Sequence, residues 1–438
     1  MHLVPTLRHP HDREIIRLAV PAFGALVAEP LFLLADSAIV GHLGTVQQAG
    51  LGIAGQALTT IVGICIFLAY GTTSSVARQV GAGNTVQALR QGVDGVWLAL
   101  AIGAALVVVG WPVSPAIVNA FGASPAVAPY AEIYLRTSLF GVPGMLVMLA
   151  GTGVLRGLQD TRTPLFVSIG CFALNLLLNV VFVLILGWGI AGSAWGTAIA
   201  QTVGAAIYAA VVVRGARAHG ASLRPDLAGL RASATAGAAL IVRTISLQLV
   251  LVVATAVSAH LGNAEAAAYT VGSRIWMFLA FALDAIAIAA QAITGRYLGA
   301  TDVAGTRAAT RRMVEWGVAC GIVFGLVVLL IRGLLPELFT HDPRVSELLV
   351  ASLVAIACMQ PIAGAVFVLD GVLIGAGDQR YLALAQTLAM VAFLPAAWFM
   401  GSLTALWGAI SLWMTVRLLT LGLRARGSAW LVTGARRE

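Results

Sequence analysis

The sequence predicts an all-α membrane protein with twelve membrane-spanning helices arranged in two lobes of six. Three observations support this prediction: the composition, the distribution of arginine along the chain, and an internal repeat. The chain of 438 residues is 60% apolar and only 10% charged, whereas soluble globular chains are closer to half apolar and a quarter charged. Apolar runs at 98–109, 165–186 and 317–331 suit the core of a bilayer, which a helix of about 20 apolar residues crosses.

Hydropathy places the twelve helices at 14–40, 47–76, 93–113, 126–155, 164–186, 190–213, 236–260, 265–294, 313–333, 346–374, 380–400 and 404–425. With the N-terminus inside, 21 of the 26 arginines fall on cytoplasmic segments and three on outer ends, as the positive-inside rule predicts. Both termini are therefore expected in the cytoplasm. All 26 basic residues are arginines, which indicates a GC-rich bacterial genome and a bacterial cytoplasmic (inner) membrane. The net charge of +8 then reflects topology, not nucleic-acid binding.

The two halves of the chain form a parallel internal repeat with a constant offset of 218 along the sequence. Gly153–Arg162 (GVLRGLQDTR) recurs as Gly371–Arg380 (GVLIGAGDQR), and the same offset maps His42 onto His260. Each half holds an even number of spans, so both halves share one orientation, and parallel repeats of this kind occur in transporters that work by alternating access. The expected organisation is an N-lobe at 1–213, a cytoplasmic linker at 214–235 and a C-lobe at 236–438.

Polar residues at membrane depth distinguish the two halves. Asp36 lies near the end of the first apolar helix, where a carboxylate costs roughly 2.5–3.5 kcal/mol unless it faces a wet cavity, has a partner or takes up a proton. Asn175 and Asn179 share one face of the fifth span, and Thr197 lies on the sixth. The equivalent positions of the second half hold Ala254, Phe393, Ala397 and Thr415. We predict a cation or proton site here; otherwise Asp36 caps its helix and the asparagines bond neighbouring helices.

Other intramembrane residues have weaker cases. Pro21 and Pro30 remove backbone donors from the helix of Asp36, so we expect that helix to bend. Candidate residues for a substrate cavity are Glu29, Gln56, Tyr70, Met145, Arg274, Phe278 and Asp284. Glu29 could instead pair with an arginine, Asp284 could form a structural ion pair with Arg274 or Arg243, and the aromatic and Met residues could be plain packing. Asp370 is expected at the membrane interface.

The sequence shows no metal-ligand cluster, nucleophile triad, phosphate-binding glycine loop or redox motif. An enzyme is therefore not expected, and neither is a cofactor. A receptor or scaffold that does not transport would have no reason to keep lone polar groups in one lobe. The remaining class is a transporter of a small organic molecule, embedded in the lipid bilayer as a monomer.

Three stretches resemble the multidrug and toxic compound extrusion (MATE) family, and most closely its DNA-damage-inducible F (DinF) branch: Ala35–Gly44, Val76–Gly83 and Gly153–Pro164. The resemblance implies a twelve-helix antiporter that exports amphipathic, cationic drugs or metabolites in exchange for protons or sodium. It also implies that Asp36 is the coupling acid.

The family's cation site is matched in part. Asn175 and Thr197 match residues of that site, whereas Asn179 stands where an Asp is common. The loss of this acid favours H+ over Na+ coupling, although a Na+ ion at Asp36, Asn175, Asn179 and Thr197 is an alternative. A lipid-linked precursor flippase of the same superfamily is the other alternative, because Arg243 and Arg274 provide positive charge at membrane depth.

Overall fold

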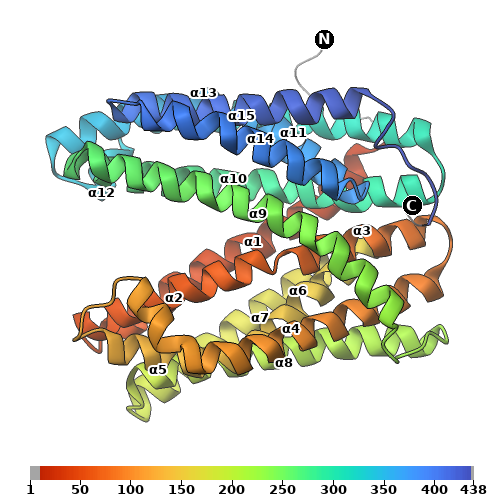
Figure 1. Cartoon of the computed structure of the whole chain (residues 1–438), viewed down its shortest axis with the longest axis horizontal. Helices are drawn as coiled ribbons and strands as arrows, with labels where there is room; N and C mark the ends of the chain where they lie inside the picture. The colour runs from red at the N-terminus through yellow and green to blue at the C-terminus, as the bar shows by residue number, and fades with distance from the viewer. Residues whose placement is uncertain (1–9, 436–438) are drawn as a thin grey trace. The chain divides into compact units, whose positions relative to one another are not determined.

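The computed structural model describes residues 10–435, apart from the side chains of Glu29, Leu33, Ala228, Ala232 and Ala236. The described chain contains fifteen α-helices, one π-helical segment and no strand. The helices (Figure 1) are α1 (Asp12–Gly41), α2 (Thr45–Ile64), α3 (Phe67–Gly81), α4 (Thr85–Ala120), α5 (Ala128–Leu139), α6 (Val142–Gly157), α7 (Arg162–Asn179), η1 (Val180–Ile185), α8 (Gly189–Ala218), α9 (Leu227–Leu261), α10 (Asn263–Gly299), α11 (Val303–Ile331), α12 (Leu335–Phe339), α13 (Pro343–Gly375), α14 (Gln379–Trp398) and α15 (Leu403–Arg426).

The prediction of an all-helical chain with twelve spans is confirmed. Eleven described stretches of helix are long and apolar enough to cross a membrane, and the pair α5–α6, bent by 51°, makes the twelfth. Helices α2 and α3 together form one of these stretches. Several helices run past their predicted ends: α4 begins at Thr85, ahead of the predicted start at 93, and the added turns are mostly polar. Hydropathy detects only the apolar part of a helix, so the more polar helix ends are missed.

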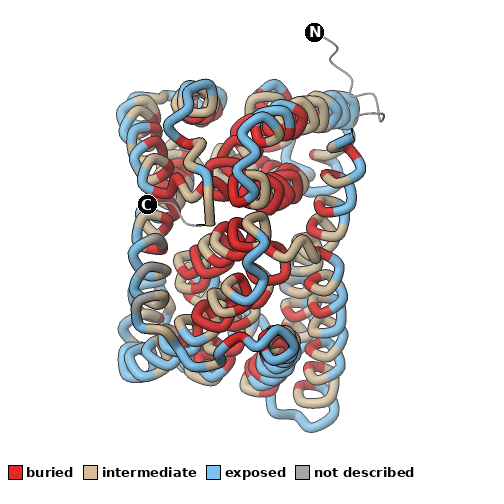
Figure 2. Tube along the Cα trace, turned by 90° about the vertical axis from the view of Figure 1, so that its right-hand side faces the viewer, coloured by how far each residue is buried: buried red, intermediate tan, exposed pale blue. Residues whose placement is uncertain are grey.

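The described chain forms two compact units. One runs from Gly24 to Gly237, and the other combines the N-terminal residues up to Phe23 with the chain from Ala238 onward. Helix α9 begins at Leu227, so much of the predicted linker at 214–235 is helical. In each unit buried residues lie where helices face one another, and the outer helix faces are exposed (Figure 2). These outer faces carry large apolar side chains, as expected of helices that contact lipid.

Equivalent positions of the two halves have equivalent packing. A Cβ at Gly153 in α6 would meet the carbonyl oxygen of Ala69 in α3. A Cβ at Gly371 in α13 would meet the carbonyl oxygen of Ala287 in α10. The repeat maps Gly153 onto Gly371 and Ala69 onto Ala287. Glycine at these points lets two helix backbones approach closely, which is the usual means of tight helix packing in membranes.

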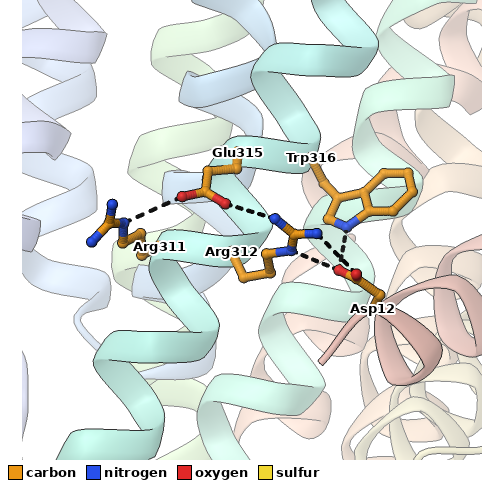
Figure 3. A network of polar contacts seen from close by, with 5 residues as sticks. All are labelled: Asp12, Arg311, Arg312, Glu315 and Trp316. Carbon is orange, nitrogen blue, oxygen red and sulfur yellow. Dashed lines mark hydrogen bonds and ion pairs between the residues drawn. The ribbon is translucent and has the colours of Figure 1, made fainter. Parts of the chain in front are cut away.

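The first turn of α1 is joined to α11 by a charged network (Figure 3). Asp12, only 2% exposed, accepts hydrogen bonds from Nε of Arg312 at 2.7 Å and from Nη2 of Arg312 at 2.9 Å. Trp316 donates its Nε1–H to the same carboxylate at 2.8 Å. Glu315 accepts from Arg312 and from the exposed Arg311. A bidentate arginine–carboxylate pair of this kind is among the stronger protein hydrogen bonds.

Candidate functional site

The carboxylate of Asp36 is the centre of a buried polar cluster in the unit that runs from Gly24 to Gly237. Its side chain is only 2% exposed. Oδ1 accepts hydrogen bonds from the hydroxyl of Ser193 at 2.6 Å and from Nδ2 of Asn179 at 2.9 Å. Oδ2 accepts from the hydroxyl of Tyr134 at 3.2 Å. The negative charge is thus surrounded by neutral donors from three different helices, α5, α7 and α8 (Figure 1).

Two side-chain amides extend the cluster away from Asp36. Nδ2 of Asn179 also donates to Oδ1 of Asn175 at 2.8 Å, and Nδ2 of Asn175 donates to Oγ1 of Thr197 at 3.0 Å. The Oδ1 atom of Asn179 is buried and has no hydrogen-bond partner among the described residues. A buried acceptor without a partner is costly. This oxygen can therefore accept a hydrogen bond or serve as a ligand of a cation.

Local sequence explains how these side chains come together. Asn175 and Asn179 lie one turn apart at the end of α7, and Ser193 and Thr197 lie one turn apart on α8. Side chains at this spacing share one helix face. The π-helical segment η1 begins directly after Asn179, and such segments are frequent at functional sites. Gly196 lies between the α8 residues, and a Cβ there would approach Oδ1 of Asn179 to 3.3 Å.

This arrangement can perform two kinds of chemistry. Burial disfavours the charged form of this carboxylate, whereas the three hydrogen bonds that it accepts favour it, so the group can bind and release a proton as those donors move. The oxygens of Asp36, Asn175, Asn179 and Thr197 also provide ligands of the type that hard cations prefer. Of these four residues, only Asp36 can carry a formal charge. Three donors already point at Asp36, so a cation would have to displace some of them.

Comparison with known sequences identifies the family. A profile of the MatE family matches residues 21–181 and 239–399. The two matched segments have equal length, and their starting points differ by the offset of the internal repeat. This chain belongs to the MatE family. It is therefore a multi-pass membrane transporter of small molecules and not an enzyme.

Relatives of the MatE family align with nearly the whole chain. The chain is 28% identical over 425 residues to DNA damage-inducible protein F of Escherichia coli, and the alignment covers 94% of this chain and 91% of that protein. It is 27% identical over 431 residues to Protein DETOXIFICATION 44, chloroplastic, of Arabidopsis thaliana, with 93% and 80% covered. The solved structure of the Vibrio cholerae MATE transporter VcmN in its bent form has a TM-score of 0.87 at 24% identity, with 94% of this chain and 96% of that chain covered. This likeness confirms the MatE fold.

Two residues of the buried cluster around Asp36 were not predicted from the sequence, namely Ser193 and Tyr134. Ser193 lies four residues before Thr197, so helical spacing was a signal that could have identified it. Tyr134 is 98 residues from Asp36 in the sequence, and no local pattern marks it. Both were hidden because a hydroxyl among apolar residues is common in membrane helices.

The remaining predicted site residues lie on helices of both units. Gln56 (α2), Arg274 and Phe278 (α10) are exposed, Tyr70 (α3) is buried, and Met145 (α6) and Asp284 (α10) are half-buried. The three hydrogen bonds that Asp36 accepts come from Tyr134, Asn179 and Ser193 and not from these predicted cavity residues. The side chain of Glu29 lies outside the described residues. Pro21 and Pro30 lie within α1, which runs unbroken from Asp12 to Gly41, and the expected bend stays a prediction.

The structure adds the partners of Asp370, which lies five residues before the end of α13 at Gly375. Asp370 is buried and forms an ion pair with Arg243, and its position at the membrane interface stays a prediction. Arg243 is also an expected alternative partner of Asp284, and that pairing stays a prediction. Arg417 also approaches Asp370, with its Nη2 3.8 Å from Oδ2. Hydropathy places Asp370 near a helix end but does not show which helices cover that end, so the burial was not predictable.

Proposed function

We propose that this chain is a proton-coupled antiporter that exports amphipathic, cationic drugs or metabolites by alternating access. Asp36 is the coupling carboxylate. The observation that supports this proposal is the carboxylate of Asp36, 2% exposed, whose contacts are hydroxyl and amide donors and not a basic side chain. A proton needs one acceptor of this kind, whereas sodium needs several oxygen ligands. Relatives named for multidrug resistance and detoxification support export of toxic organic compounds.

Protonation of Asp36 changes the direction of hydrogen bonds in the cluster. The charged carboxylate accepts from Tyr134, Asn179 and Ser193, whereas the protonated acid must donate one bond. The hydroxyl of Ser193 can turn to accept it, and Asn179 can present its partnerless Oδ1 after rotation of its amide. Either change alters the contacts of α1 with α7 and α8. Proton binding is thereby linked to helix packing, with α1 and its two prolines as the element that bends.

Sodium coupling is the second candidate. It is favoured by the buried Oδ1 of Asn179, which has no partner among the described residues and could be an uncharged ligand of the ion. We propose further that the protein is a monomer in a bacterial cytoplasmic membrane, with both termini in the cytoplasm and no resident cofactor.

Efflux of a fluorescent cationic dye from proteoliposomes tests the proposal, with a proton gradient and a sodium gradient applied separately. Wild type is compared with Asp36→Asn and with Glu347→Gln, which removes an exposed carboxylate. The expected result is proton-driven efflux that Asp36→Asn abolishes and Glu347→Gln retains. Efflux driven by sodium alone refutes the ion assignment. Unimpaired efflux by Asp36→Asn removes this residue from the mechanism, and no dye transport by folded wild type favours the lipid-linked precursor flippase.

A further inference from the structure

The connection between the two copies of the repeat carries a concentrated positive charge. Residues 214–235 join α8 to α9 and hold four arginines and one acid, Asp226, which gives them a formal charge of +3. The arginines are Arg214, Arg217, Arg224 and Arg231. The flanking segments Gly189–Ala218 and Gly229–Leu261 are long and apolar enough to span a membrane, so the chain between them lies at a membrane surface.

The charge of these four arginines is not neutralised by the described part of the chain. All four residues are exposed, and none of them forms an ion pair with a described residue. Asp226, the acid within the connection, pairs instead with Arg90 of α4 at 3.4 Å. The arginine side chains are therefore available to an anionic partner from outside the protein.

The connection is held against α4 by specific contacts. Trp97 of α4 donates its Nε1–H to the carbonyl oxygen of Leu223 at 3.0 Å. The backbone N–H of Asp226 donates to Oδ1 of Asp94, also on α4, at 3.0 Å. Ala221 is only 7% exposed and belongs to an apolar cluster formed with residues of α4, α6 and α8. A connection fixed in this way presents its arginines in an ordered arrangement, which reduces the entropy lost when a ligand binds.

Exposed apolar side chains lie close to these arginines. Leu227, in the first turn of α9, is 81% exposed, and Trp97, which contacts the residue before Arg224, is 44% exposed. Tryptophan is enriched at the boundary between a membrane and water, and segments that lie in this boundary combine basic residues with apolar side chains that enter the lipid. A soluble anion would use the arginines but not Leu227. The combination favours a lipid as the partner.

We propose that the connection at 214–235 is a binding surface for the head groups of anionic phospholipids. A guanidinium fork matches phosphate oxygens through paired hydrogen bonds, and clusters of basic residues directly beside a membrane helix attract anionic lipids. Arg214 and Arg217 lie three residues apart on α8, so they are neighbours on its surface. This surface goes beyond the proposed proton-coupled export, because it uses none of the residues around Asp36 and its test requires no transport.

Binding of phosphatidylglycerol with a fluorescent acyl chain tests this surface. The lipid is titrated into the purified, delipidated full-length protein in a neutral detergent, with equally labelled phosphatidylcholine as the zwitterionic control. Wild type should bind phosphatidylglycerol several-fold more tightly, and high salt should reduce this preference because salt screens exposed charges. Combined replacement of three arginines, Arg214→Gln, Arg217→Gln and Arg224→Gln, should weaken phosphatidylglycerol binding by about fivefold for each charge removed.

A second triple variant is the matched control. It removes three exposed arginines at the ends of other helices and should leave phosphatidylglycerol binding unchanged: Arg162→Gln, Arg332→Gln and Arg380→Gln. If arginines at 214–235 only determine the topology of the chain, wild type binds both lipids equally, and that result refutes the surface. Equal losses in the two triple variants also refute it.

Two further outcomes are decisive. Displacement of the labelled lipid by soluble glycerophosphoglycerol at equal concentration refutes the assignment to a phospholipid, since the apolar contacts would then contribute nothing. Should the first triple variant fail to fold, its three single variants decide. A loss of about fivefold in each supports the surface, and unchanged affinity in all three refutes it.

Discussion

Removal of Arg312 is expected to expose how strongly the first turn of α1 depends on its charged network (Figure 3). Arg312→Gln deletes both short hydrogen bonds from Arg312 to Asp12, at 2.7 and 2.9 Å. The hydrogen bond from Trp316 to the same carboxylate is kept. Asp12 is 2% exposed, so its charge cannot gain much from water. Breaking a buried ion pair from one side typically costs about 3–5 kcal/mol.

The neighbouring arginine provides a matched control. Arg311 pairs with Glu315 at 3.2 Å, but its side chain is 83% exposed. Exposed ion pairs contribute about 0–1 kcal/mol, so Arg311→Gln should lower the free energy of unfolding by no more than that. The two variants remove the same charge from adjacent positions of α11 and differ in burial.

The measurement is reversible denaturant unfolding of the purified protein in detergent, followed by a double-mutant cycle with Asp12→Asn. Because Asp12→Asn removes the buried charge that has lost Arg312, the double variant should be more stable than Arg312→Gln alone, which corresponds to a large coupling energy. Equal losses for Arg311→Gln and Arg312→Gln, or additive losses in the cycle, would refute the reasoning.

Three further predictions concern the Asp36 cluster and the repeat. Ser193→Ala removes the shortest bond to Asp36, 2.6 Å, and should slow proton-driven dye efflux by roughly 10- to 150-fold, since such bonds contribute roughly 1.5–3 kcal/mol. Asn179→Asp places a second carboxylate beside Asp36 and should make efflux respond to a sodium gradient, because hard cations favour charged oxygen ligands. Gly371→Ala forces a Cβ against the carbonyl oxygen of Ala287 and should lower the free energy of unfolding by about 1–3 kcal/mol, measured in detergent.

Two of these three variants have a control on a comparable helix, and Asn179→Asp is compared with wild type. Thr202→Val deletes a hydroxyl that donates to the carbonyl oxygen of Ala198 on its own helix, and efflux as slow as in Ser193→Ala would contradict a specific role for Ser193. Sodium response in wild type equal to that of Asn179→Asp would mean that the amide already suffices as a ligand. Gly422→Ala adds a Cβ where no described atom lies within 4 Å, so a stability loss equal to that of Gly371→Ala would contradict the packing argument.

Much of the candidate site was predictable because departures from the repeat are visible in the sequence. Asp36, Asn175 and Asn179 stand where the second half has apolar residues, and the structure brings all three into one hydrogen-bonded cluster. The spacing of the two asparagines also determined that they share a face. Their role in coupling stays a prediction that transport measurements must test.

The sequence by itself determined the class of this protein, because the bilayer imposes its requirement on each helix separately. About 20 apolar residues must be contiguous in a span, so composition and the internal repeat were enough for twelve helices in two like halves. Tertiary structure alone decided the partners of the charges. Asp12 finds Arg312 across 300 residues, and Arg243 finds Asp370 across 127. Such pairs depend on the rotation and depth of whole helices, which hydropathy and helical periodicity along one segment do not contain.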